Sequence, residues 1–394
     1  MKKSHIVMLV SGVCVLAGLV IGGIGVLAGG LTQSIYTDQE GIHMVKEEER
    51  MTEKKSLQEF KRMELNVPGI TVVFQEGEEY GLEYDFWPQV KIQRMEVSDG
   101  TLYVEVEHEI ISFFNFGFWR ENILTVYYPK DVEFESVEAK TGSGSIRAAD
   151  LNGRTIQLTA SSGSVSAERF KGEEINLNSS SGSVKANGID ASVLAAGASS
   201  GSIRMENCTA GDSFTVGTSS GSVTVEGIQT GNLTASASSG SVRATDVRAK
   251  EQVTLSASSG SVHAKEVTAG TLTMTASSGS VNLENCTADS FQGKSNSGGV
   301  RGNGISSQNT TAQSTSGSIH LEGNLTGSTV AKSTSGSVRI QTKASKAESA
   351  YLLHSNSGST RVNGNKESGT LNKTAENTFD LSATSGSVSL DFVQ

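Results

Sequence analysis

One short phrase, Ser-Gly-Ser-Val or a close variant, recurs thirteen times through residues 140–394. The interval between its central glycines is 19 or 20 residues ten times in succession, and then 22 and 28. A fixed period of this size is the signature of a solenoid, in which each repeat buries its apolar face only against its neighbours. The central glycines are Gly144, Gly163, Gly182, Gly201, Gly221, Gly240, Gly260, Gly279, Gly298, Gly317, Gly336, Gly358 and Gly386.

The apolar residues around each glycine show which kind of solenoid to expect. Around Gly260 they fall at Val253 and Leu255 before it and at Val262 and Ala264 after it. Spacing by two is the period of a β-strand, in which alternate side chains lie on opposite faces. The sequence therefore predicts an all-β fold, a single-stranded parallel β-helix of 13 coils of about 19–20 residues, stacked at ~4.8 Å per layer.

The central glycine interrupts this alternation, which indicates a corner of the coil. We expect glycine there because a tight corner needs a positive φ. The flanking serines, such as Ser162 and Ser164, are expected to stack in columns and to satisfy backbone groups at the corner. The alternative is that the repeated hydroxyls form an array that contacts ice or sugar.

Two of the three cysteines follow the same register. Cys208 and Cys286 each lie seven residues after a central glycine, at a position where other coils carry residues such as Ile228 and Val247. They are four coils apart, or about 19 Å at the usual strand spacing, which is beyond the reach of a disulfide. We interpret both as buried small hydrophobes, and a metal-ligand or nucleophile role is the alternative.

Charged residues recur at two outward positions of the repeat. The residue three places after the glycine is basic in seven coils and acidic in none, and two places further on acids recur, as at Glu206 and Glu226. Either the two columns neutralise each other, at about 0.2–1 kcal/mol per pair, or the basic column contacts an anionic polymer of the cell wall. The basic column consists of Arg147, Lys185, Arg204, Arg243, Arg301, Arg339 and Arg361.

The N-terminus predicts a membrane anchor. Lys2 and Lys3 precede an uncharged run of 26 residues, 6–31, and about 20 apolar residues suffice to cross a bilayer. Positive charge stays on the cytoplasmic side. We therefore expect a single-pass cell-membrane protein whose N-terminus is cytoplasmic and whose bulk is extracytoplasmic. The alternative is a signal peptide cleaved after Val26-Leu27-Ala28.

Between the predicted anchor at 1–31 and the repeats we expect a polar juxtamembrane stalk at 32–60 and an N-terminal β cap at 61–139. The predicted cap contains an aromatic segment that joins two strands. Its rings either pack over the first coil or form an exposed contact for a membrane or a partner protein. The residues concerned are Phe113, Phe114, Phe116, Phe118 and Trp119.

The net charge and the regular repeat spacing limit the classes of function to expect. A net charge of -10 argues against nucleic acid as a partner. The ten regular intervals leave no room for the loops that wall a catalytic cleft, so we expect no enzyme and no cofactor, with a polysaccharide-acting β-helix as the remote alternative. A third possibility is a rod that self-associates through its C-terminal coil. Its open edge would lie at Val393-Gln394, unless the insertion around Lys366–Thr374 covers it.

The strand at 122–129, followed by residues 137–146 and the repeated Ser-Gly-Ser-Val, resembles the bacterial "putative adhesin" domain-of-unknown-function family. The resemblance covers roughly residues 55–394. It implies a membrane-linked β-solenoid associated with envelope stress in Gram-positive bacteria, and it supplies no catalytic residues. We therefore expect a non-catalytic, adhesin-like binding or scaffolding surface at the cell envelope, whose partner is an envelope component or a protein.

Overall fold

The computed structural model describes residues 18, 33–38, 41–108, 120–371 and 374–393. The predicted anchor at 6–31 therefore lies almost wholly outside the described residues, and the aromatic segment 113–119 lies outside them entirely. Within the described ranges no helix has the length and hydropathy to span a bilayer.

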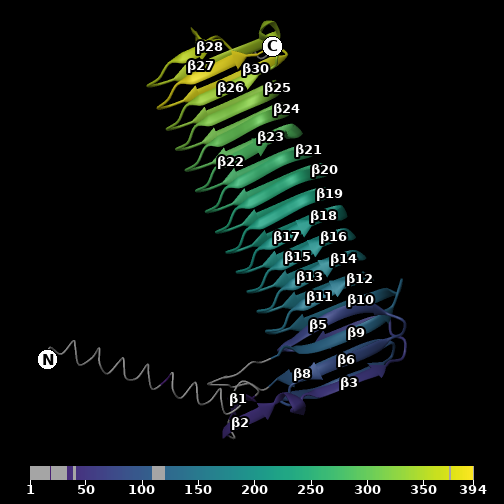
Figure 1. Cartoon of the computed structure of the whole chain (residues 1–394). Coiled ribbons are helices and arrows are strands. Elements are labelled where there is room, and N and C mark those ends of the chain that lie inside the picture. Colours follow the sequence, from purple (N-terminus) through teal and green to yellow (C-terminus); the bar gives the residue numbers. More distant parts are fainter. Residues whose placement is uncertain (1–17, 19–32, 39–40, 109–119, 372–373, 394) are drawn as a thin grey trace, which may run out of the picture.

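The chain forms an all-β parallel solenoid that extends as a rod (Figure 1). Each coil has a short strand after the central glycine and a longer strand before the next one, as in β11 (Ile146–Ala149) and β12 (Asn152–Ala160). In the next layer β13 (Val165–Glu168) pairs with β11, and β14 (Lys171–Ser179) pairs with β12, both in parallel. The rod thus has a short-strand face and a long-strand face, each made of stacked parallel strands.

Further along the rod the two strands of a coil often merge into one continuous run. The strands of these layers are β15 (Val184–Asn187), β16 (Asp190–Ala198), β17 (Ile203–Glu206), β18 (Thr209–Thr218), β19 (Val223–Ala237), β20 (Val242–Ala257), β21 (Val262–Ala276), β22 (Val281–Glu284), β23 (Thr287–Ser295), β24 (Val300–Ser314), β25 (Ile319–Ser333) and β26 (Val338–Thr342).

The parallel stack begins before the first Ser-Gly-Ser phrase. Both β4 (Arg62–Asn66) and β8 (Thr101–His108) continue the long-strand face below β10 (Glu133–Thr141), and β5 (Ile70–Gly77) and β9 (Asn122–Pro129) continue the short-strand face below β11. The outermost strands then run antiparallel, with β7 (Val90–Ser98) on β8, β6 (Gly81–Phe86) on β9, and β3 (Met51–Ser56) on β6. The antiparallel strands end the stack at its N-terminal side.

Residues 33–56, where a stalk was expected, contain strands. A hairpin is formed by β1 (Gln33–Asp38) and β2 (Gly41–Lys46), and a 3-10 turn, η2 (Glu47–Glu49), precedes β3.

The core runs along the whole stack. Val253, Leu255, Val262 and Ala264, the inward residues predicted around Gly260, are each at most 2% exposed. A single cluster of buried hydrophobic side chains extends from Phe60 to Leu390. The inward register read from the sequence is confirmed.

The physical reason predicted for the central glycine is wrong. None of the thirteen has a positive φ. A Cβ built on Gly163 would instead lie 1.8 Å from the carbonyl oxygen of Gly144, one layer below. Glycine is needed because adjacent layers approach too closely for any side chain. The positive φ lies at the next corner, six residues after the glycine, as at Asp150 and Gly188.

The layers exchange order at the C-terminal end (Figure 1). The last coil in sequence, β30 (Asn377–Ala383) and β31 (Val388–Phe392), stacks directly on β25 and β26. The preceding coil, β27 (Ser349–Ser355) and β28 (Thr360–Val362), follows it as the outermost layer. Because β31 pairs with β26 on one side and with β28 on the other, it is an inner strand of the stack.

The insertion covers the outermost layer instead. β29 (Asn365–Lys366) pairs antiparallel with β28, and the Leu353 N–H donates to the Ser368 carbonyl at 2.8 Å on the β27 side. A second 3-10 turn, η3 (Lys346–Glu348), leads into β27. Self-association through the C-terminal coil stays a prediction.

Candidate functional site

The predicted basic column exists as a continuous line on the short-strand face. Strand register places Arg147 beside Ser166, Ser166 beside Lys185, and Lys185 beside Arg204, one layer apart each time. The line continues in register through Thr224, Arg243, His263, Asn282, Arg301, His320 and Arg339, and at the exchanged end through Ser389 to Arg361. Neighbours are ~4.8 Å apart, and no acid interrupts them.

Acids lie two positions away on the same strands, but few of them pair with the column. Arg204 forms ion pairs with Glu206 and, at 3.6 Å, with Glu226. Arg147 forms an ion pair with Glu121 at 3.3 Å. Glu121 directly precedes β9 and does not belong to the acidic column. All seven members of the column are exposed. Over the described ranges five of them form no ion pair: Lys185, Arg243, Arg301, Arg339 and Arg361.

Mutual neutralisation therefore accounts for only part of the basic column. Mutual neutralisation accounts for Arg204 but leaves most of the cations exposed to solvent and unpaired. Burial and, to a smaller extent, the field of the neighbouring Arg243 lower the pKa of His263 in this column.

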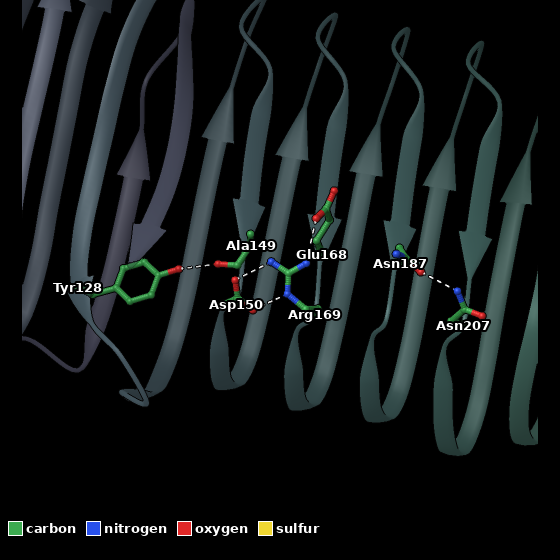
Figure 2. A network of polar contacts seen from close by, with 7 residues as sticks. All are labelled: Tyr128, Ala149, Asp150, Glu168, Arg169, Asn187 and Asn207. Atoms are coloured by element: carbon green, nitrogen blue, oxygen red, sulfur yellow. Dashed lines mark hydrogen bonds and ion pairs between the residues drawn. The ribbon is translucent and has the colours of Figure 1, made fainter. Parts of the chain in front are cut away.

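A second row of polar contacts joins layers at the positive-φ corner (Figure 2). The Arg169 guanidinium, in a residue with φ of 54°, donates to both carboxylate oxygens of Asp150 at 2.6 and 2.7 Å, and contacts Glu168 at 3.2 Å. The bond from Arg169 holds the pKa of the Asp150 carboxyl below its usual value.

Two further bonds in this row use neutral groups (Figure 2). The Tyr128 hydroxyl donates to the Ala149 carbonyl at 3.0 Å, and the Asn207 amide donates to the Asn187 side-chain oxygen at 2.9 Å. Burial raises the pKa of Tyr128. The Arg169–Asp150 and Asn207–Asn187 contacts each link one layer to the next, and the Tyr128 bond spans the layer of β5, so this row stabilises the stack and presents no reactive group.

Many of the repeated serines are structural, as predicted for Ser164. The backbone N–H of Ser164 donates to the Ser145 hydroxyl at 3.1 Å, and the N–H of Ser183 donates to the Ser164 hydroxyl at 3.2 Å. Deeper in the corner, the Ser179 hydroxyl donates to the Gly163 carbonyl at 2.8 Å. The other predicted serine, Ser162, is exposed, and within the described residues its hydroxyl forms no hydrogen bond.

The two described cysteines are inert side chains of the core. Cys208 and Cys286 are each 1% exposed, and neither forms a disulfide with another described residue. Burial raises the pKa of Cys208 to about 11, so its thiol is protonated at neutral pH. In the part of the chain that the structure describes, no group of three His, Cys, Asp or Glu side chains could hold a metal ion.

The long-strand face carries a pattern that the sequence analysis missed. Three outward positions of each long strand are uncharged in five consecutive layers, and in the last four of these layers they carry hydroxyls, as in Thr234-Ala235-Ser236 and Thr273-Met274-Thr275. The signal is present in the sequence, six and four residues before the central glycine. Recognising the pattern required knowing that these positions lie together on one side of the coil.

Comparison of the chain with known proteins identifies one matching family. A family model described as Toastrack DUF4097 matches residues 60–245 and again 231–391. No curated protein matches the chain. Among solved structures, a Parabacteroides distasonis protein described as a "putative lipid binding protein" is 16% identical, with a TM-score of 0.39, over 64% of this chain and 96% of that one. A Bacteroides fragilis "putative adhesin" is 13% identical, with a TM-score of 0.33, over 66% of this chain and 96% of that one.

Proposed function

Starting from the premise that the chain belongs to the Toastrack DUF4097 family, we propose that it is a non-catalytic, adhesin-like binding scaffold of the cell envelope. In this proposal residues 6–31 hold it in the cell membrane with the N-terminus in the cytoplasm. The solenoid lies outside the membrane and presents its basic column to an anionic polymer of a Gram-positive envelope.

The observation that carries the proposal is the line of exposed, unpaired cations along the short-strand face. Successive members of the column are one to three layers apart, with the widest gap between Arg243 and Arg301, so a linear polyanion lying along the rod would meet a positive charge every ~5–14 Å. Such a repeat suits a polymer with one anionic group per unit. The chain's net charge of -10 opposes long-range attraction, so binding depends on short-range pairing that salt weakens.

The rod geometry supports a scaffolding role. The strands β3 and β7 end the stack on its N-terminal side, and the exchanged layers β27–β31 lie at the other end (Figure 1). A chain anchored at its N-terminus would therefore extend the basic column away from the membrane. Each coil repeats the same outward positions, which lets a column of weak contacts add up along one polymer.

The test is binding of the full chain, in detergent micelles, to a purified polyphosphodiester wall polymer such as teichoic acid. The variant Arg243→Ser/Arg301→Ser/Arg339→Ser removes three unpaired members of the column. We expect its affinity to fall at least about tenfold, since each lost charge contact is worth about 0.5 kcal/mol or more. The matched control, Arg154→Ser/Arg248→Ser/Lys250→Ser, removes the same charge from exposed positions outside the column.

Equal losses in the two variants would show that net charge, rather than the column, governs binding, and would refute the proposal. So would wild-type protein that fails to bind the polymer at low salt. Turnover of a wall polysaccharide by the full chain would show instead that the protein is an enzyme.

A further inference from the structure

The long-strand face contains an uncharged patch that the basic column does not use. It spans five layers, formed by β16, β18, β19, β20 and β21, with three outward positions in each. We name these fifteen positions the hydroxyl face; they are Val193, Ala195, Gly197, Ser213, Thr215, Gly217, Asn232, Thr234, Ser236, Gln252, Thr254, Ser256, Thr271, Thr273 and Thr275.

Strand register turns these residues into a regular lattice. Thr215 lies beside Thr234, Thr234 beside Thr254, and Thr254 beside Thr273, in one column along the rod. A second column, two residues further along each strand, contains Ser236, Ser256 and Thr275. Hydroxyls therefore repeat every ~4.8 Å along the rod and every ~6.6 Å across it.

The hydroxyls of this lattice are available to a ligand. Thr254 accepts a bond from the Gln252 amide at 3.0 Å. Elsewhere on the face, among the residues that the structure describes, the side-chain hydroxyls form no hydrogen bond: Thr215, Thr234, Ser236, Ser256, Thr271, Thr273 and Thr275. In the corners, by contrast, hydroxyls such as those of Ser145 and Ser164 bond to the backbone. The fold uses the corner hydroxyls and leaves those of the face free.

The fold does not require this face to be uncharged. The same columns carry Glu174 one layer below the patch and Lys294 one layer above it. In the patch's own layers, the short-strand face carries Arg204, Glu226 and Arg243. Charge is thus absent from these fifteen positions over five layers, a length of ~19 Å. Asp212 and Glu251 lie beside them on the same strands, and Glu251 accepts a bond from the Asn232 amide at 3.0 Å.

We propose that the hydroxyl face binds an uncharged polysaccharide chain. A hydroxyl both donates and accepts hydrogen bonds, so the lattice matches a polymer that offers donors and acceptors at a short, regular interval and has no charge to compensate. A sugar chain lying along the rod meets these conditions, because one layer is close in length to one sugar unit. A second copy of this chain is a poorer match, since the face has no aromatic anchor of the kind that holds protein interfaces together and its one large apolar side chain, Val193, lies at its edge.

The experiment uses the full chain in detergent micelles and two insoluble neutral glycans, cellulose and chitin, as probes. The variant Thr234→Val/Thr254→Val/Thr273→Val removes three hydroxyls and keeps the shape and strand preference of the residues. The matched control, Thr209→Val/Thr268→Val/Thr287→Val, alters exposed threonines outside the face. Circular dichroism and thermal melting verify that each variant is folded.

We expect wild-type protein and the control to be retained by at least one glycan, and the face variant to bind it at least about tenfold more weakly. Binding of the anionic wall polymer should be unchanged in the face variant, which separates this proposal from that for the basic column. Three results would overturn it: no retention of wild-type protein on either glycan, equal retention of the face variant, or a concentration-dependent dimer that the face variant abolishes. Thermal hysteresis of freezing without glycan retention would reassign the face to ice.

Discussion

The carbonyl oxygen of Gly221 occupies the space that a side chain on Gly240 would need. A Cβ built on Gly240 would lie 1.9 Å from that oxygen, and the same relation repeats from layer to layer through the stack. Two layers can approach this closely only where neither has a side chain. The repeated glycine thus keeps the layers in contact at one corner of the rod.

Replacing this glycine should open the stack. We expect Gly240→Ala to lower the free energy of unfolding by about 3 kcal/mol or more, since even moderate overpacking costs about 1–3 kcal/mol and here the clash is with backbone. Thermal melting followed by circular dichroism measures the loss. The control is Gly211→Ala, where an added Cβ has no neighbour nearer than 3.8 Å and φ is not positive. Equal melting temperatures for the two variants would contradict the close-approach explanation.

Much of the stack could be predicted from the sequence, because the period of the phrase and the period-two apolar pattern are local signals. They gave the parallel strands, the inward residues such as Val253 and Leu255, and the buried thiols. The reason for the glycine could not be predicted in this way. A close approach between Gly144 and Gly163 depends on how one layer lies on the next, whereas a positive φ is the property that glycine shows within a single chain segment.

The exchanged order of the layers at the C-terminal end could not be predicted from the sequence for a similar reason. The intervals of 22 and 28 residues marked an irregularity near Gly358 and Gly386, but every coil carries the same phrase and can stack on any other. Which coil lies outermost depends on where the insertion packs. Likewise, the basic column could be read from spacing, while the lack of acidic partners for Arg243 required the side-chain geometry.

The contact between Arg169 and Asp150 should make stability depend on pH. The pKa of Asp150 is lower in the folded chain than its usual value, so its contribution is present above about pH 4 and is lost as the pH falls through the folded pKa. We expect Asp150→Asn to melt below wild type at pH 7 by a small margin, since both groups are exposed. The margin should shrink between pH 4 and pH 2. A margin that is constant over this range would contradict the assignment.

The thiol of Cys208 should resist modification in the folded protein. Its pKa of about 11 and its 1% exposure keep it protonated and out of reach. In a Cys14→Ser/Cys286→Ala background, we expect no reaction with a thiol reagent at pH 8 within minutes, and complete reaction after unfolding in guanidinium chloride. Reaction of the folded protein at the rate of an exposed thiol would contradict the placement of this coil.

The exchanged layer order can be tested by cross-linking. Arg339 and Ser389 are direct neighbours on β26 and β31, whereas Arg339 and Arg361 are two layers apart, or ~10 Å. A disulfide needs Cα atoms within about 7 Å of each other. In a cysteine-free background we therefore expect Arg339→Cys/Ser389→Cys to form a disulfide under mild oxidation and Arg339→Cys/Arg361→Cys to remain reduced. A gel-shift assay after alkylation distinguishes them. If the coils stacked in sequence order, the second pair would be adjacent and the outcome would be reversed, because β28 would then lie directly on β26.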